Sequence, residues 1–147
     1  MKNNMSPNEY ENFIKDKMPK PKLISNCIKA FIVGGLISDI GQFITNTLKG
    51  MGLNQEQVSS GTAIILVFLG ALFTGLGIYD KLGRFAGAGS IVPITGFSNS
   101  IVSPAMEFKR EGYVFGVGAR MFIIAGPVLV YGISTSVVIG IIYFIFF

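Results

Sequence analysis

The chain alternates between long apolar segments and short polar ones, a pattern typical of a protein that crosses a membrane several times. Apolar residues dominate 28–48, 61–79 and 121–147. Each segment is long enough to cross a bilayer as a helix, at about 1.5 Å per residue. We therefore predict an all-α integral membrane protein with three clean transmembrane helices. Residues 1–26 form a polar tail, and residues 27–147 form a single transmembrane domain.

A fourth segment, residues 85–106, carries no charge in its 22 residues but is poorly suited to lipid. Gly, Ala, Ser, Thr and Asn outnumber its large apolar residues, and Pro93 and Pro104 interrupt it. Such backbone is tolerated in a membrane where it is buried in protein or lines a water-filled cavity. We predict a Gly/Pro-broken segment that is either a re-entrant hairpin or a distorted fourth crossing.

The distribution of Lys and Arg distinguishes these two arrangements. Five lysines in the tail predict a cytoplasmic N-terminus, because cytoplasmic segments carry the excess of basic residues. A full crossing by residues 85–106 would place Lys109, Arg110 and Arg120 on the outer side, against this rule. A segment that turns back keeps them inside. We favour the re-entrant hairpin and keep the fourth crossing as the alternative.

The tail carries the start signals of a short amphipathic helix. Ser6 is expected as the N-cap, Pro7 as the first helical residue and Glu9 as the partner that closes a capping box. The apolar residues that follow on one face are Tyr10, Phe13, Ile14 and Met18. This face suits the membrane surface or a partner protein, and a frayed tail is the alternative.

Composition excludes several classes of function. Half of the residues are hydrophobic and 14% are charged, against about 25% in an ordinary soluble domain. The net charge of +4 lies near the ends of apolar segments, so we expect contact with lipid and no nucleic acid. Without histidine and with one cysteine, the usual catalytic triads and zinc sites are absent. Asp39, Asp80 and Glu107 are too scattered for a calcium loop. We expect no enzyme, no cofactor and no resident metal.

Polar residues recur along one side of the first apolar segment. Gly35, Asp39, Gln42 and Asn46 are spaced by four, three and four residues, which places them on one stripe of a helix. A carboxylate near the middle of a bilayer is costly and normally faces protein or water. We interpret Asp39, Gln42 and Asn46 as candidate lining of a polar path. Interhelical hydrogen bonding, or a shallower position of the helix, is the alternative.

The broken segment holds a second set of candidates. Broken intramembrane helices can direct their N-terminal dipoles at anions, while free carbonyl groups line a cavity. The candidate path residues in this segment are Ser90, Pro93, Thr95, Gly96, Ser98, Asn99 and Ser100. Arg84 and Arg120 flank it and are candidates to hold an anion. Alternatively, Arg84 pairs with Asp80 one turn earlier, and Arg120 only marks the membrane edge.

Small residues form two ridges at helical spacing, which we interpret as helix-packing surfaces. The residues are Gly70, Thr74 and Gly77 in the second apolar segment and Gly132, Ser136 and Gly140 in the last. Small residues let two helix backbones approach closely, so packing is favoured over a ligand-binding role. The pattern leaves open whether the partner helix belongs to this chain or to another.

Two stretches of the chain resemble a known family. Residues 19–42 read PKPKLISNCIKAFIVGGLISDIGQ, and residues 85–100 read FAGAGSIVPITGFSNS. Both are similar to the stage V sporulation protein AC/AEb family, and the similarity runs from about Pro19 through the last apolar segment. The Asn-Cys-Ile-Lys-Ala-Phe stretch at 26–31 favours the AC branch over the AEb branch.

The resemblance implies an integral protein of the spore inner membrane, derived from the forespore membrane of an endospore-forming bacterium. It further implies a hetero-oligomeric complex with other stage V sporulation protein A subunits. This complex moves dipicolinic acid, with calcium, into the forespore and out again during germination. The alternative is a non-conducting scaffold subunit of the same kind of complex. A chain with three or four spans is too small to enclose such a path alone, which favours partners.

Overall fold

The computed structural model describes residues 10–11, 13–14, 17 and 22–146 of the chain, and nearly all of them are helical. In the tail, Tyr10, Phe13 and Ile14 are helical, in agreement with the amphipathic pattern. The expected start at residues 6–9 and the apolar Met18 lie outside the described residues.

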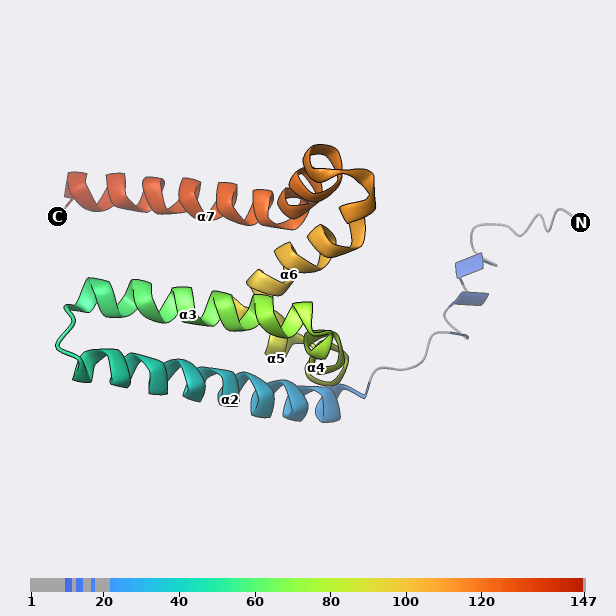
Figure 1. Ribbon diagram of the computed structural model, residues 1–147, viewed down its shortest axis with the longest axis horizontal. Coiled ribbons are helices and arrows are strands. Elements are labelled where there is room, and N and C mark those ends of the chain that lie inside the picture. The colour runs from blue at the N-terminus through green and yellow to red at the C-terminus, as the bar shows by residue number, and fades with distance from the viewer. Residues whose placement is uncertain (1–9, 12, 15–16, 18–21, 147) are drawn as a thin grey trace, which may run out of the picture.

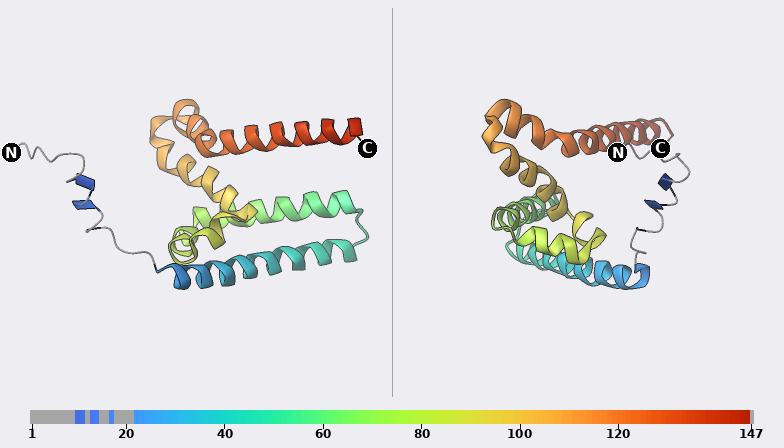
Figure 2. Two further views of the ribbon diagram at one scale, coloured as in Figure 1. Left: turned by 180° about the vertical axis from the view of Figure 1, so that it is seen from behind. Right: turned by 90° about the vertical axis from the view of Figure 1, so that its right-hand side faces the viewer.

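The first two membrane helices form an antiparallel pair. Helix α2 spans Leu23–Gly50 and helix α3 spans Gln55–Gly75, and the two lie side by side (Figures 1 and 2). The hydroxyl oxygens of Thr45 and Thr62 lie 3.1 Å apart across this pair. A hydrogen bond between helices is favourable here because lipid offers the two groups no other partner.

Helix α3 begins at Gln55, six residues earlier than the sequence pattern predicts. The reason is a capping box at Asn54 and Gln57. The Gln57 N–H donates to Asn54 Oδ1 at 2.8 Å, and the Asn54 N–H donates to Gln57 Oε1 at 3.1 Å. These two bonds satisfy donors that the first helical turn leaves free, so the helix extends into the polar segment.

The same helix ends at Gly75, so the predicted second span, 61–79, extends too far at this end. Leu76 caps the helix, and Gly77 adopts a left-handed conformation with φ of 69°. Only glycine enters this region without steric cost. Gly77 therefore turns the chain, and Tyr79 belongs to the next helix.

Three short helices then form a hairpin. Helix α4 spans Ile78–Ala86, α5 spans Ala88–Ile91 and α6 spans Ile94–Glu107. Figures 1 and 2 show α4 beside the start of α2 and the last turn of α6 directed toward the same end of the molecule. The chain reverses around Pro93, whose extended backbone (ψ of 162°) precedes α6. This arrangement is the re-entrant one, and it differs from a fourth crossing.

A tight turn leads into the last helix. A 3₁₀ turn (η1, Phe108–Glu111), Gly112 with φ of 98° and a π-helical turn (η2, Tyr113–Gly118) precede α7, Ala119–Phe146. Helix α7 packs against α6 near its beginning and then runs freely away from that end (Figure 1).

Exposed apolar surface dominates the three long helices. Leu23–Gly50, Gln55–Gly75 and Tyr113–Phe146 are each long and apolar enough to cross a membrane. Large side chains point outward from them, with Phe31 82% and Phe144 88% exposed. Such a surface requires lipid or protein around it. The prediction of an all-α membrane protein with three spans and one broken segment is confirmed.

Candidate functional site

The centre of the hairpin is a buried polar network. The Tyr79 hydroxyl on α4 donates to the backbone carbonyl of Ser90 at 2.6 Å and lies 3.0 Å from Thr95 Oγ1. All three residues are buried. Because Ser90 precedes the chain reversal and Thr95 follows it, this single hydroxyl joins both arms of the hairpin.

A second group of hydrogen bonds attaches α6 to α3. The Ser98 hydroxyl donates to the Val67 carbonyl at 2.8 Å. The Thr74 hydroxyl lies 2.9 Å from Asn99 Oδ1 and 2.6 Å from the Gly70 carbonyl. These bonds replace water for groups that would otherwise be buried without a partner. The hairpin is thereby fixed to α3 along its second arm.

Glycines let the hairpin backbone touch its neighbours. A Cβ atom at Gly70 would lie 2.7 Å from the Thr95 carbonyl oxygen and 2.9 Å from Ser98 Cβ. A Cβ atom at Gly89 would collide with the backbone of Ala30 on α2. The first contact joins α3 to α6, and the second joins α2 to α5. Both require a residue without a side chain.

The candidate path residues in the hairpin form a packed core. Ser90, Thr95, Gly96 and Ser98 are buried, and Pro93, Asn99 and Ser100 are half-buried. Ser100 donates to the Phe97 carbonyl of its own helix at 2.7 Å. No buried side-chain oxygen or nitrogen among the described residues lacks a hydrogen-bond partner. The polar groups of this motif therefore hold the hairpin together.

The polar stripe of α2 has the opposite character. Gly35, Asp39, Gln42 and Asn46 are all exposed on the surface of the chain. Gln42 Nε2 donates to Asn46 Oδ1 at 2.8 Å, so the two amides partner each other. Gly41, which faces Leu66 of α3, lies on another side of the helix. The structure thus brings the stripe together and turns it away from α3.

Both candidate arginines have partners in the chain. Arg84 Nη2 lies 2.9 Å from Asp80 Oδ2, which is the pairing considered as the alternative. Arg120 lies 3.8 Å from Glu111, and its guanidinium stacks 4.1 Å from the centre of the Phe108 ring. Arg120 thereby connects the start of α7 to the turn before it. The structure does not bring the two arginines into a shared anion site with the hairpin motif.

The two proposed packing ridges have different surroundings. Gly70 and Thr74 lie in the contact between α3 and α6. Gly77 lies beyond the end of α3 and makes the left-handed turn. The residues on α7, Gly132, Ser136 and Gly140, are exposed. Their partner, if packing is their role, lies outside the described part of this chain.

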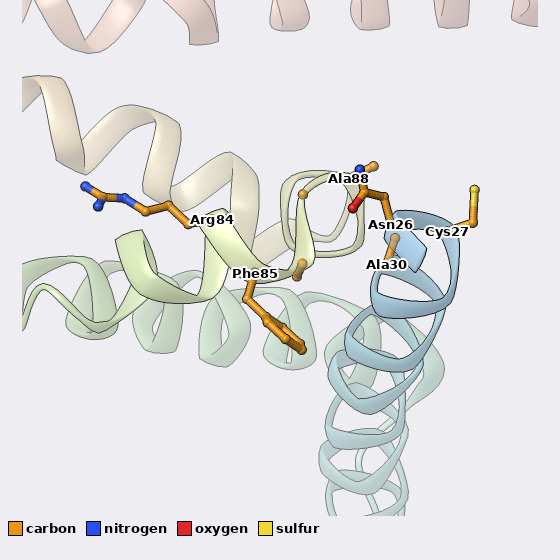
Figure 3. A pocket seen from close by; sticks show the side chains of 8 residues that line it. Asn26, Cys27, Ala30, Arg84, Phe85 and Ala88 are labelled. Carbon is orange, nitrogen blue, oxygen red and sulfur yellow. The ribbon is translucent and has the colours of Figure 1, made fainter. Parts of the chain in front are cut away.

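A hollow of about 330 Å³ lies where α2 begins beside the hairpin (Figure 3). Its walls include Asn26, Cys27, Ala30, Arg84, Phe85 and Ala88. Figure 3 shows Asn26 reaching toward Ala88 across the junction of α2 and α5, whereas Arg84 extends away along α4. The Lys29 ammonium lies 4.9 Å from the centre of the Phe85 ring, so a cation flanks this hollow.

Sequence reasoning did not single out Tyr79 or Gly89. Tyr79 looked like the last residue of an apolar span, although a tyrosine hydroxyl inside a membrane protein normally needs a partner. Gly89 lies in a run of small residues that signals close packing without naming the helix it meets. The small residues Ala30, Gly34 and Ser38, spaced by four on α2, are the matching signal on the other side.

The fold defines an α-helical integral membrane protein whose central segment is a re-entrant hairpin. The family model described as SpoVAC/SpoVAEB sporulation membrane protein matches residues 26–142. Over 138 residues the chain is 47% identical to Stage V sporulation protein AC of Bacillus subtilis (strain 168), covering 93% of this chain and 92% of that relative. The chain belongs to the SpoVAC/SpoVAEB family of sporulation membrane proteins. No solved structure matches it.

Proposed function

We propose that this chain is a subunit of a spore inner-membrane complex that moves dipicolinic acid, with calcium, into the forespore and out during germination. Membership of the sporulation membrane family supports a role in a spore membrane. The helical spans and the re-entrant hairpin support transport, since such hairpins recur in transporters and channels. In this proposal the N-terminus is cytoplasmic and other stage V sporulation protein A subunits are the partners.

The observation that carries the proposal is the exposed polar stripe of α2. Asp39, Gln42 and Asn46 lie on the outside of a helix that is long and apolar enough to cross the membrane. A carboxylate facing lipid at the centre of such a helix costs about 2.5–3.5 kcal/mol or more. Water or another subunit must cover this face in the assembled complex. A path shared between subunits meets that requirement.

The chemistry of the stripe fits a calcium-bound dicarboxylate better than a free one. The amides of Gln42 and Asn46 offer both donors and acceptors, which suits a polar solute that leaves its hydration shell. Asp39 would repel a free dianion by like charge. It is compatible with the calcium chelate, in which the metal offsets the charge of the carboxylates. The proposal therefore favours joint movement of calcium and dipicolinic acid.

A non-conducting scaffold is the second candidate function. It is favoured by the hairpin, whose polar residues Thr95, Ser98 and Asn99 bond to α3 and α4 of the same chain. In this alternative, the hairpin's polar residues serve only to make these hydrogen bonds. The chain then supplies a rigid frame, and a sister subunit supplies the path. The stripe would then be a contact with that subunit.

To test the proposal, the two amide side chains on α2 that bond to each other, Gln42 and Asn46, are replaced in spores. A Gln42→Leu, Asn46→Leu double variant keeps the helix and removes the polar lining, so we expect slower dipicolinic acid release during germination. Phe43→Leu is the control, because Phe43 is 73% exposed on the same turn and apolar. The amount of each variant in the membrane is measured alongside. Wild-type release from the double variant at normal abundance would favour the scaffold.

A further inference from the structure

We propose that this chain binds an anionic phospholipid at the end of the molecule where α2 begins. The lipid phosphate lies between Lys29 and Lys81, which flank the Phe85 ring, and one acyl chain lies in an apolar groove between α2 and α3. This lipid site is separate from the polar stripe of α2, and it does not depend on the solute that the complex moves.

Helix α4 has the surface of a helix that lies along a membrane. It is seen nearly end-on in Figure 1, where α2 and α3 lie lengthwise, so it runs across the ends of these two spans. One side faces the protein through the buried Tyr79, and a second side carries the exposed ion pair of Asp80 and Arg84. The third side is apolar but exposed, with Ile78 49% and Phe85 56% exposed. A helix between protein, water and lipid needs three such sides, so α4 marks the level of the lipid headgroups.

Two lysines meet at the apolar side of α4. The Lys29 ammonium lies 4.9 Å from the centre of the Phe85 ring, and Figure 3 shows this ring extending from α4 alongside the first turns of α2. Lys81 precedes Phe85 by four residues on α4, so the two are neighbours on the helix surface. Neither lysine has an acidic partner among the residues that the structure describes. Two uncompensated cations at headgroup level attract the phosphate of an anionic lipid.

An apolar groove of about 230 Å³ follows the same side of α2 as Lys29. Val33, Leu36 and Ile40 line it, and with Lys29 they are spaced by four, three and four residues, which places all four on one stripe of the helix. The stretch from Lys29 to Ile40 covers about 17 Å at about 1.5 Å per residue, close to half of the about 30 Å hydrocarbon core. The lysine and the groove together therefore have the depth of one lipid leaflet.

The other walls of the groove make it suitable for hydrocarbon. They include Leu66 and Phe73 of α3 and Leu82 of α4. The two hydroxyl-bearing residues in the wall, Tyr79 and Thr95, are hydrogen-bonded to each other at 3.0 Å. An apolar hollow whose polar groups are already satisfied excludes water and accepts an apolar ligand. An acyl chain meets that requirement, and its headgroup then lies at the lysines.

Tryptophan fluorescence tests the groove, because the chain has no tryptophan of its own. Phe73→Trp places the reporter in the groove wall, and Phe144→Trp places a control on α7, where Phe144 is 88% exposed. The full chain is reconstituted in phosphatidylcholine bilayers with rising fractions of phosphatidylglycerol, whose brominated chains quench tryptophan on contact. We expect quenching at position 73 at a roughly tenfold lower fraction of phosphatidylglycerol than at position 144, since each cation contributes roughly fivefold in affinity.

Lysine variants of the Phe73→Trp chain test the headgroup contact. We expect Lys29→Gln and Lys81→Gln each to reduce the preference for phosphatidylglycerol by roughly fivefold. Lys109→Gln is the control, because Lys109 is another exposed lysine, and it should change nothing. Equal quenching at positions 73 and 144, or equal effects of all three lysine variants, would overturn the site. Reversal of the quenching by added glycerol phosphate would also overturn it, since that compound carries the charge without the chains.

A helix of another subunit is the competing occupant of the groove. A photoreactive benzoylphenylalanine in place of Leu36, which is 58% exposed on the groove wall, cross-links whatever lies there in native membranes. A mass gain of one phospholipid supports the lipid site, and a cross-link to a second polypeptide contradicts it. Both results are independent of dipicolinic acid release, so failure of the lipid site is distinguishable from failure of the proposed function.

Discussion

The hydroxyl of Ser98 on α6 donates a hydrogen bond to the backbone carbonyl of Val67 on α3 at 2.8 Å. The carbonyl belongs to a helix that is long and apolar enough to cross a membrane. The bond holds the outgoing arm of the hairpin against a membrane span. The same arm is held at Thr74, whose hydroxyl lies 2.9 Å from Asn99 Oδ1.

Replacing Ser98 with alanine removes this bond and leaves its neighbours in place. We expect Ser98→Ala to lower the free energy of unfolding by about 0.5–1.5 kcal/mol, the range for one hydrogen bond between helices in a membrane protein. Thermal denaturation in detergent measures the effect. Ser100→Ala is the control, since Ser100 bonds only within its own helix, and equal stability of both variants would contradict the assigned contact.

A methyl group at Gly89 should separate α5 from α2. The added Cβ would collide with the Ala30 backbone, which cannot move aside as a flexible side chain would. We expect Gly89→Ala to lower stability by about 1–3 kcal/mol, as overpacking does, and to reduce the folded protein recovered from membranes. Gly35→Ala on the open side of α2 meets nothing within 4 Å and should be tolerated. Similar losses in both variants would argue against this contact.

The Tyr79 hydroxyl should be required for a stable chain reversal. Tyr79→Phe leaves the Ser90 carbonyl without its partner and frees Thr95, at a cost of about 1–3 kcal/mol for a buried unsatisfied group. Protease sensitivity of the hairpin in detergent, compared with wild type, reports the loss. Tyr131→Phe on the exposed face of α7 is the matched change, and a hairpin as resistant as that control would refute the role of Tyr79.

Gly77 should resist substitution for a backbone reason. Its φ of 69° lies in the left-handed region, where a Cβ costs about 1–2 kcal/mol. Gly77→Ala should therefore destabilise the chain although nothing lies within 4 Å of the position. In contrast, Gly75→Ala within α3 should be neutral or stabilising, by up to about 1 kcal/mol, because alanine favours a helix. Thermal denaturation of the pair tests this difference in sign.

The spans and the chain reversal could be predicted from sequence because hydropathy and basic residues act over whole segments. The ends of α3 could not. At its start, Asn54 and Gln57 form a capping box with asparagine in place of the more familiar serine or threonine. At its end, Gly77 follows Gly70 and Thr74 at helical spacing. The sequence pattern alone therefore does not distinguish a glycine that turns the chain in a left-handed conformation from one that packs against another helix.

The roles of polar residues within the membrane were harder to predict, since an uncharged polar side chain can bond to its own chain or face a path. Thr95 in the hairpin and Gln42 in the α2 stripe carry the same kind of signal in sequence. The structure separates them, because Thr95 is buried beside Tyr79 while Gln42 and its neighbour Asp39 are exposed. That separation depends on which helix lies opposite, which helical spacing alone does not specify.

Because the chain reverses in the hairpin, three helices in the described part of the chain are long and apolar enough to cross a membrane completely. Three crossings would put the start of α2 and the end of α7 in different compartments, and the two lie at opposite ends of the molecule (Figure 1). With that topology, a soluble protein confined to one face of the membrane would reach only one of these two helix ends. Reporter tags fused at the two ends would experience different chemical surroundings throughout sporulation.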